Sequence, residues 1–130
     1  MKLETRKTTI GKSGESFYNF LTDLNNFKDL MPENIEKFEV DGDSFIFGLK
    51  GMPEIRLVLK EKLACHKIVL GAASSKLEFS LTIQIDEVSE NSCESQLFFQ
   101  GDFNPMMAMM IKNPLQKFID TLSEKAEKLS

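Results

Sequence analysis

A succession of short alternating segments followed by one long helical segment constrains the fold of this chain most strongly. Between Ile35 and Asp102, apolar and polar residues alternate in runs that turn residues separate, as in strands with one face in water. From Pro105 to Leu129 the apolar residues instead recur at helical spacing. Because the strands and the helix each have one apolar face to bury, we expect an α+β domain in which they pack together.

Turn residues divide the alternating region into six expected strands in hairpin succession. The turn Asp41–Asp43 carries the strongest signal, since an Asp-Gly pair favours a tight hairpin. The alternation is clearest from Leu77 to Ile85. Successive hairpin turns lie at alternate ends of a sheet. The turns Asp41–Asp43, Ala64–His66 and Ser89–Ser92 should therefore share a polar end, and those at Gly51–Pro53, Ala73–Ser75 and Gly101–Asn104 should share an apolar end.

The residues before the sheet predict a first strand and two short helices. The strand is expected from Leu3 to Ile10, and Ser13 is a suitable cap for a helix from about Glu15 to Thr22. A second helical turn, capped by Asp23 or Asn25, carries Phe27, Leu30 and Met31 and ends at Pro32. We expect Met31 to lie near the apolar end of the sheet.

A run of methionines opens the long helix, for which Asn104 is the expected cap and Pro105 the first residue. Met107 lies on the main apolar stripe of the helix, whereas Met106, Met109 and Met110 fall outside it. The first two turns are therefore apolar nearly all round. Three interpretations stay open for these methionines: the rim of a pocket, a contact with another subunit, or ordinary packing. Inside the helix, Pro114 predicts a kink.

Size and charge limit the class of protein. The 130 residues suit one domain, 1–130, and the net charge of -4 comes from interleaved acids and bases without a basic stripe. This pattern argues against binding to nucleic acid and against steady attachment to an anionic membrane. No run reaches the roughly 20 apolar residues of a spanning helix, and the N-terminal residues lack a signal-peptide core. We expect a cytoplasmic protein without stable membrane insertion.

The segment from Ser13 to Pro32, SGESFYNFLTDLNNFKDLMP, together with the order of elements, resembles the SRPBCC superfamily of START-related and birch-pollen-allergen-like helix-grip proteins. It is similar to the opening of small bacterial members described as polyketide cyclases or dehydratases. The resemblance implies a seven-stranded antiparallel sheet that grips the C-terminal helix around an apolar cavity, which opens where that helix begins. Members bind lipids, sterols, quinones or polyketides and some are enzymes, and fold does not decide between these functions.

Few residues suggest chemistry. His66, the sole histidine, falls at the polar end, far from the expected cavity mouth. Cys65 and Cys93 are expected two strands apart, too far for a disulfide, and so should be free thiols. Ser95 shares the parity of the interior residues of its strand. No spacing of ligands suggests a metal site, and we predict no cofactor and no catalytic residue.

The sequence thus favours non-catalytic binding or carriage of a hydrophobic small molecule, such as a lipid, a quinone or a polyketide-like compound. An enzyme of cyclase or dehydratase type and an interaction module with a closed core, including a homodimer, remain alternatives. The predicted ligand-binding residues face the interior: Phe45, Phe47, Leu57, Leu59, Leu70, Phe79, Leu81, Leu97, Phe99, Met107, Ile111, Leu115 and Phe118. The predicted pocket rim is Met31, Met52, Phe103, Met106 and Met110.

Overall fold

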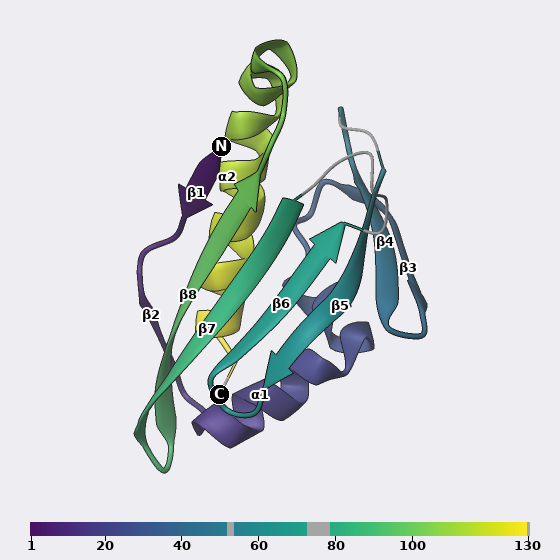
Figure 1. The fold of residues 1–130 in the computed structure, drawn as a ribbon. Helices are drawn as coiled ribbons and strands as arrows, with labels where there is room; N and C mark the ends of the chain where they lie inside the picture. Colours follow the sequence, from purple (N-terminus) through teal and green to yellow (C-terminus); the bar gives the residue numbers. More distant parts are fainter. Residues whose placement is uncertain (52–53, 73–78, 130) are drawn as a thin grey trace.

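A computed structural model describes residues 1–51, 54–72 and 79–129 of the chain. The described elements follow one another along the chain in this order (Figure 1): β1 (Lys2–Glu4), β2 (Thr8–Ile10), α1 (Gly14–Thr22), the 3-10 helix η1 (Leu24–Leu30), β3 (Ile35–Asp41), β4 (Ser44–Leu49), β5 (Ile55–Leu63), β6 (Lys67–Ala72), β7 (Phe79–Ser89), β8 (Ser92–Gly101) and α2 (Pro105–Glu127).

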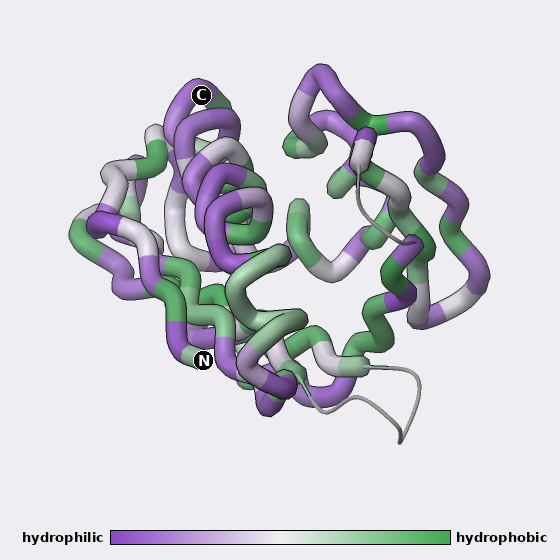
Figure 2. The backbone as a smooth tube through the Cα atoms, turned by 90° about the horizontal axis from the view of Figure 1, so that it is seen from above, coloured by the Kyte–Doolittle hydropathy of each residue, from purple (hydrophilic) through white to green (hydrophobic). Residues whose placement is uncertain are grey.

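The strands form one antiparallel sheet around the long helix. Its order is β1-β8-β7-β6-β5-β4-β3, with β2 also paired to β8, so consecutive strands from β3 to β8 are neighbours. Figure 2 looks along α2 and shows the strands arranged around the helix, while Figure 1 shows α1 across one end of the sheet. The predicted α+β helix-grip architecture is confirmed.

The sheet has eight strands where we expected seven, because the first strand is broken. Glu4 pairs with Phe98 but Thr8 pairs with Ser95, so the N-terminal segment uses one more residue than β8 over the same distance. Within this irregularity the Thr5 hydroxyl accepts a hydrogen bond from the backbone N–H of Leu97 at 3.0 Å. A side-chain hydroxyl, and not a backbone carbonyl, thus accepts the hydrogen bond from this strand N–H. The alternation of apolar and polar residues gives no sign of such a break in the pairing.

Local signals in the sequence set the element boundaries. Ser13 caps α1 by accepting a hydrogen bond from the Ser16 N–H, and Asp23 caps η1 in the same manner. Asn104 accepts from the Met107 N–H at 2.8 Å, and α2 continues through Pro114. In the β3–β4 hairpin Gly42 has φ of +61°, a conformation that favours glycine.

The two ends of the sheet differ. The turns between β3 and β4, between β5 and β6, and between β7 and β8 lie together at the end covered by α1, which we call the closed end (Figure 1). The opposite end, where β8 finishes and α2 begins, we call the open end. The expected turn at Ala73–Ser75 and most of the turn at Gly51–Pro53 lie outside the described residues.

The core lies between the sheet and the later turns of α2. Buried residues recur along this part of the helix, and the ring of Phe118 stacks on that of Phe47 with centroids 4.6 Å apart. At the end of the helix, Lys125 donates a hydrogen bond to the carbonyl oxygen of Met31, and Glu127 accepts one from Arg6 at 2.8 Å. These contacts join the end of α2 to the segment after η1 and to the segment between β1 and β2.

Candidate functional site

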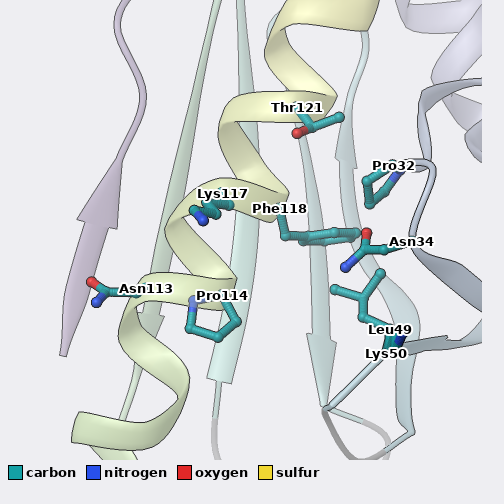
Figure 3. Close-up of a pocket in the computed structure, with 9 residues that line it drawn as sticks. All are labelled: Pro32, Asn34, Leu49, Lys50, Asn113, Pro114, Lys117, Phe118 and Thr121. Carbon is teal, nitrogen blue, oxygen red and sulfur yellow. The ribbon is translucent and has the colours of Figure 1, made fainter.

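A groove of about 420 Å³ runs between α2 and the edge of the sheet formed by β3 and β4. One wall comes from the segment that joins η1 to β3 and from the end of β4, and the other comes from the middle of α2 (Figure 3). The lining residues are Pro32, Asn34, Leu49, Lys50, Asn113, Pro114, Lys117, Phe118 and Thr121.

The floor of the groove is apolar. Leu49 and Phe118 are buried, and Figure 3 shows the Phe118 ring directed from α2 towards Asn34 and Leu49. The wall opposite the helix is held by a backbone hydrogen bond of 3.1 Å from the Lys50 N–H to the Asn34 carbonyl oxygen. A rigid apolar floor of this kind suits the body of a hydrophobic molecule.

Polar groups surround this floor. Thr121 lies on the side of α2 that faces Pro32, whereas Asn113 lies on the opposite flank of the helix (Figure 3). Lys50 and Lys117 are exposed to solvent. The nine described residues that line the groove include amides, a hydroxyl and two lysines, but neither a histidine nor a carboxylate. The groove can therefore hydrogen-bond a polar substituent, and its chemistry favours holding a molecule over transferring protons.

Most of the predicted lining residues are packed against one another. Of that set, only Phe118 lines the groove. Four members, Leu59, Phe79, Met107 and Ile111, are half-buried. The others are buried in one hydrophobic cluster: Phe45, Phe47, Leu57, Leu70, Leu81, Leu97, Phe99, Leu115 and Phe118. The structure thus brings these side chains together between the sheet and α2, and their contact with a ligand stays a prediction.

The predicted rim residues do not form one group. Phe103 is half-buried and stacks near Phe79 and Phe99, while Met106 and Met110 are exposed. The expectation that Met31 lies at the apolar end is wrong. Met31 is buried beside Lys125, which is 19 residues and so roughly 28 Å along the helix from Met106.

The misplacement of Met31 has a physical reason: η1 packs against the C-terminal half of α2, and its last residues follow it there. Met52, the remaining rim residue, lies outside the described residues.

The remaining groove residues were not predictable from the sequence, because three distant segments supply them. Leu49 continues the parity of Phe45 and Phe47, and this was the one signal available for it. Thr121 is a polar residue three positions after Phe118, at the border of the apolar stripe. Pro32 and Asn34 lie in a connection whose path depends on tertiary packing.

The reactive side chains lie away from the groove. His66 is exposed in the turn after β5, at the closed end, as predicted. Cys65 and Cys93 are free thiols, also as predicted. Burial, with a contribution from the nearby Glu87 carboxylate, raises the pKa of Cys93 to about 11. Ser95 faces the interior as expected, with its hydroxyl buried and unpaired among the described residues.

No described helix is long and apolar enough to cross a membrane. Within ranges 1–51, 54–72 and 79–129, acidic, histidine and cysteine side chains do not gather in a group that could hold a metal ion.

Comparison with known proteins shows similarity in structure alone. No family model matches the chain, and no curated protein matches it. A START superfamily protein from Mycobacterium smegmatis has 11% sequence identity and a TM-score of 0.67, with 99% of each chain covered. Truncated norcoclaurine synthase from Thalictrum flavum has 14% identity and a TM-score of 0.66, with 100% of this chain and 96% of the other covered.

A third solved structure, of a protein from Thermus thermophilus, has 14% identity and a TM-score of 0.70 over 98% of this chain and 95% of the other. These similarities extend over the whole domain at low sequence identity, so they show the fold. The resemblance to START-related and birch-pollen-allergen-like helix-grip proteins is confirmed at that level.

Proposed function

We propose that this chain binds a hydrophobic small molecule without transforming it, and that the molecule enters through the groove beside α2. The observation that carries this proposal is the groove itself, about 420 Å³ with the apolar floor of Leu49, Pro114 and Phe118. Its volume falls in the range of about 300–1,000 Å³ that small-molecule sites occupy. Burial against this floor supplies the affinity, at roughly 25 cal/mol for each Å² of apolar surface removed from water.

The aromatic residues connect the groove to the interior. Phe118 stacks on Phe47, and Phe47 lies with its ring 6.0 Å from that of Phe45. A rotation of the Phe118 side chain would lengthen the groove towards these rings, which belong to the predicted lining. The proposed ligand therefore has an elongated or planar apolar body, as a lipid, a quinone or a polyketide-like compound has, with a polar group near Asn34 and Thr121.

The solved structures support the choice of ligand class. Norcoclaurine synthase, which has the same fold, was solved in complex with dopamine and hydroxybenzaldehyde, so this fold can accommodate small aromatic molecules. We favour binding over an enzyme of cyclase or dehydratase type because the described groove lining lacks a histidine or carboxylate to move protons.

Native mass spectrometry of the protein purified from its own host tests the proposal. We expect a non-covalent adduct of an apolar molecule. In the variant Thr121→Trp, the indole should fill the groove and reduce the adduct at least about tenfold, since a methylene-sized clash already costs binding on that scale. The matched control Thr9→Trp places the same bulk on the exposed face of β2 and should keep the adduct. A wild-type protein that carries no adduct and binds no apolar probe would contradict the proposal.

A further inference from the structure

The first two turns of α2 expose three large apolar side chains at the open end. Met106, Met109 and Met110 are 75%, 83% and 72% exposed. In Figure 1 this part of the helix projects beyond the ends of the neighbouring strands. We call these three residues the methionine tip. Single exposed apolar residues are ordinary, but three on adjacent turns of a projecting helix indicate a surface that something covers.

The charges on the same helix are of one sign. From Pro105 to Ile119 it carries Lys112 and Lys117 and no acidic residue, although the chain as a whole has 20 acidic residues against 16 lysines and arginines. The first acid of the helix is Asp120, and the nearest acid before it is Asp102. An apolar tip followed by cations therefore faces solvent at the open end.

Along the helix axis, the two lysines follow the exposed methionines. Lys112 is three residues after Met109 and so about 4.5 Å further along the helix axis. Lys117 is eight residues after Met109 and so about 12 Å from it along the axis. Lys117 also lies on the face of Met106, because their separation of 11 positions is close to three helical turns. If the tip enters an apolar layer, the two ammonium groups reach the depth at which lipid headgroups lie.

We propose that the methionine tip docks the protein reversibly on the surface of a lipid bilayer that contains anionic headgroups. The methionines enter the acyl boundary, and Lys112 and Lys117 contact the phosphates. Flexible methionine side chains suit a fluid surface without fixed shape. Two cations and three methionines give a weak contact that exchanges readily, consistent with a carrier that leaves the membrane again.

A second copy of this chain is the less suitable occupant. A stable protein interface uses about 20–30 residues on each side, and a projecting tip of three residues cannot present such an area. A bilayer, by contrast, needs no complementary concave surface. The tip is also continuous with the groove, because Met110 lies one helical turn before the groove residue Pro114 on the same face.

Vesicle flotation with the whole protein and without added ligand tests the docking. We expect the wild type to float with vesicles of phosphatidylcholine and phosphatidylglycerol, and less with phosphatidylcholine alone. The variant Met106→Ser/Met109→Ser/Met110→Ser should bind at least about tenfold more weakly, since each methionine contributes apolar area. The matched control Leu63→Ser/Val88→Ser removes exposed apolar side chains elsewhere, 49% and 58% exposed, and should float like the wild type.

Substitution of lysines tests the electrostatic part of the docking. Lys112→Gln, which lies outside the groove, should lower binding to the anionic vesicles about fivefold and leave binding to phosphatidylcholine unchanged. In the control Lys62→Gln/Lys128→Gln, two exposed lysines outside the tip are changed, and binding should stay the same. A wild type that floats with neither vesicle would overturn the proposal. So would sedimentation of a wild-type dimer that the triple methionine variant converts to monomer, because a second copy would then cover the tip.

Discussion

The two halves of α2 both carry large apolar residues, but these lie in opposite environments. In the C-terminal half, Phe118, Ile119 and Leu122 are buried, and Leu122 is 2% exposed. In the N-terminal half, Met109 is 83% exposed and Met110 is 72% exposed. The apolar sequence of a helix therefore indicates what the helix can bury, while the reach of the surrounding strands decides what it does bury.

The same contrast separates the two ends of the molecule. At the closed end even polar side chains are buried: the Thr8 hydroxyl donates to the Ser95 carbonyl oxygen at 3.3 Å, and the Ser123 hydroxyl donates to Thr8 at 3.4 Å. The methionine tip lies at the open end, and the groove lies between the two ends, beside the middle of α2. We infer that the closed end supplies stability and that the groove and the methionine tip supply binding.

Substitution in each half of α2 tests this division most strongly. Leu122→Ala should lower the free energy of unfolding by about 2–5 kcal/mol, because it removes a buried side chain and leaves a cavity. Met109→Ala, the matched change in the exposed half, should stay within about 0.5 kcal/mol of the wild type. Urea denaturation measures both. Equal losses for the two variants would show that the methionine tip is packed, and the comparison would fail.

Part of the open end is tightly packed around Gly101, the last residue of β8. A Cβ atom at Gly101 would lie 2.6 Å from Cε2 of Phe103 and 2.9 Å from Cβ of Phe79. We expect Gly101→Ala to cost about 1–3 kcal/mol in urea denaturation, because the aromatic stack must shift. In the control Gly48→Ala the nearest atom is Cγ of Glu54 at 3.4 Å, so the cost should be smaller. A neutral Gly101→Ala would indicate that Phe103 moves freely.

The buried thiol of Cys93 should make the closed end sensitive to alkaline pH. Its pKa is about 11 in the folded chain against an ordinary value of 9.0, so the unfolded chain releases this proton first. The stabilisation is complete below pH 9 and is lost between pH 9 and pH 11, at most about 1.4 kcal/mol per pH unit.

Cys93→Ala isolates this loss, because the variant keeps every other titrating group. Its free energy of unfolding should fall less steeply than that of the wild type in this window. Parallel curves for the two proteins would place the thiol in contact with water.

The cap of α2 provides the smallest expected effect. Asn104→Ala removes the hydrogen bond from the Met107 N–H and should cost about 1 kcal/mol. Asn113→Ala, the control on an exposed position in the same helix, should be neutral or slightly stabilising because alanine has the higher helix propensity. Hydrogen exchange should show the loss in the first turns of α2 only. Faster exchange throughout α2 would contradict the independence of its two halves.

The sequence was sufficient for most of the fold because local rules act within a few residues. The hairpin at Asp41–Asp43 and the caps Ser13 and Asn104 each predict a boundary that the structure confirms. The alternation is seen in β7 from Phe79 to Ile85, while Leu77 lies outside the described residues. The break between β1 and β2 was not predictable, since it depends on a hydrogen bond between Thr5 and Leu97, 92 residues apart.

The candidate site was less predictable, for the same reason. The groove joins residues from the connection before β3, from the end of β4 and from α2, and only tertiary packing brings these segments together. The helical wheel set Met106, Met109 and Met110 apart from the apolar stripe, and their exposure agrees with this. A wheel cannot show where the strands end, however, and therefore could not indicate what covers these residues.

Amide chemical-shift titration with decanol tests most directly whether binding belongs to the groove. If the groove binds an apolar molecule, the largest saturable shifts should fall on Leu49, Phe118 and Thr121. The resonances of Ile10 and Cys93, fully buried at the closed end, should stay in place. The absence of saturable shifts, or shifts centred on Ile10 and Cys93, would contradict the account.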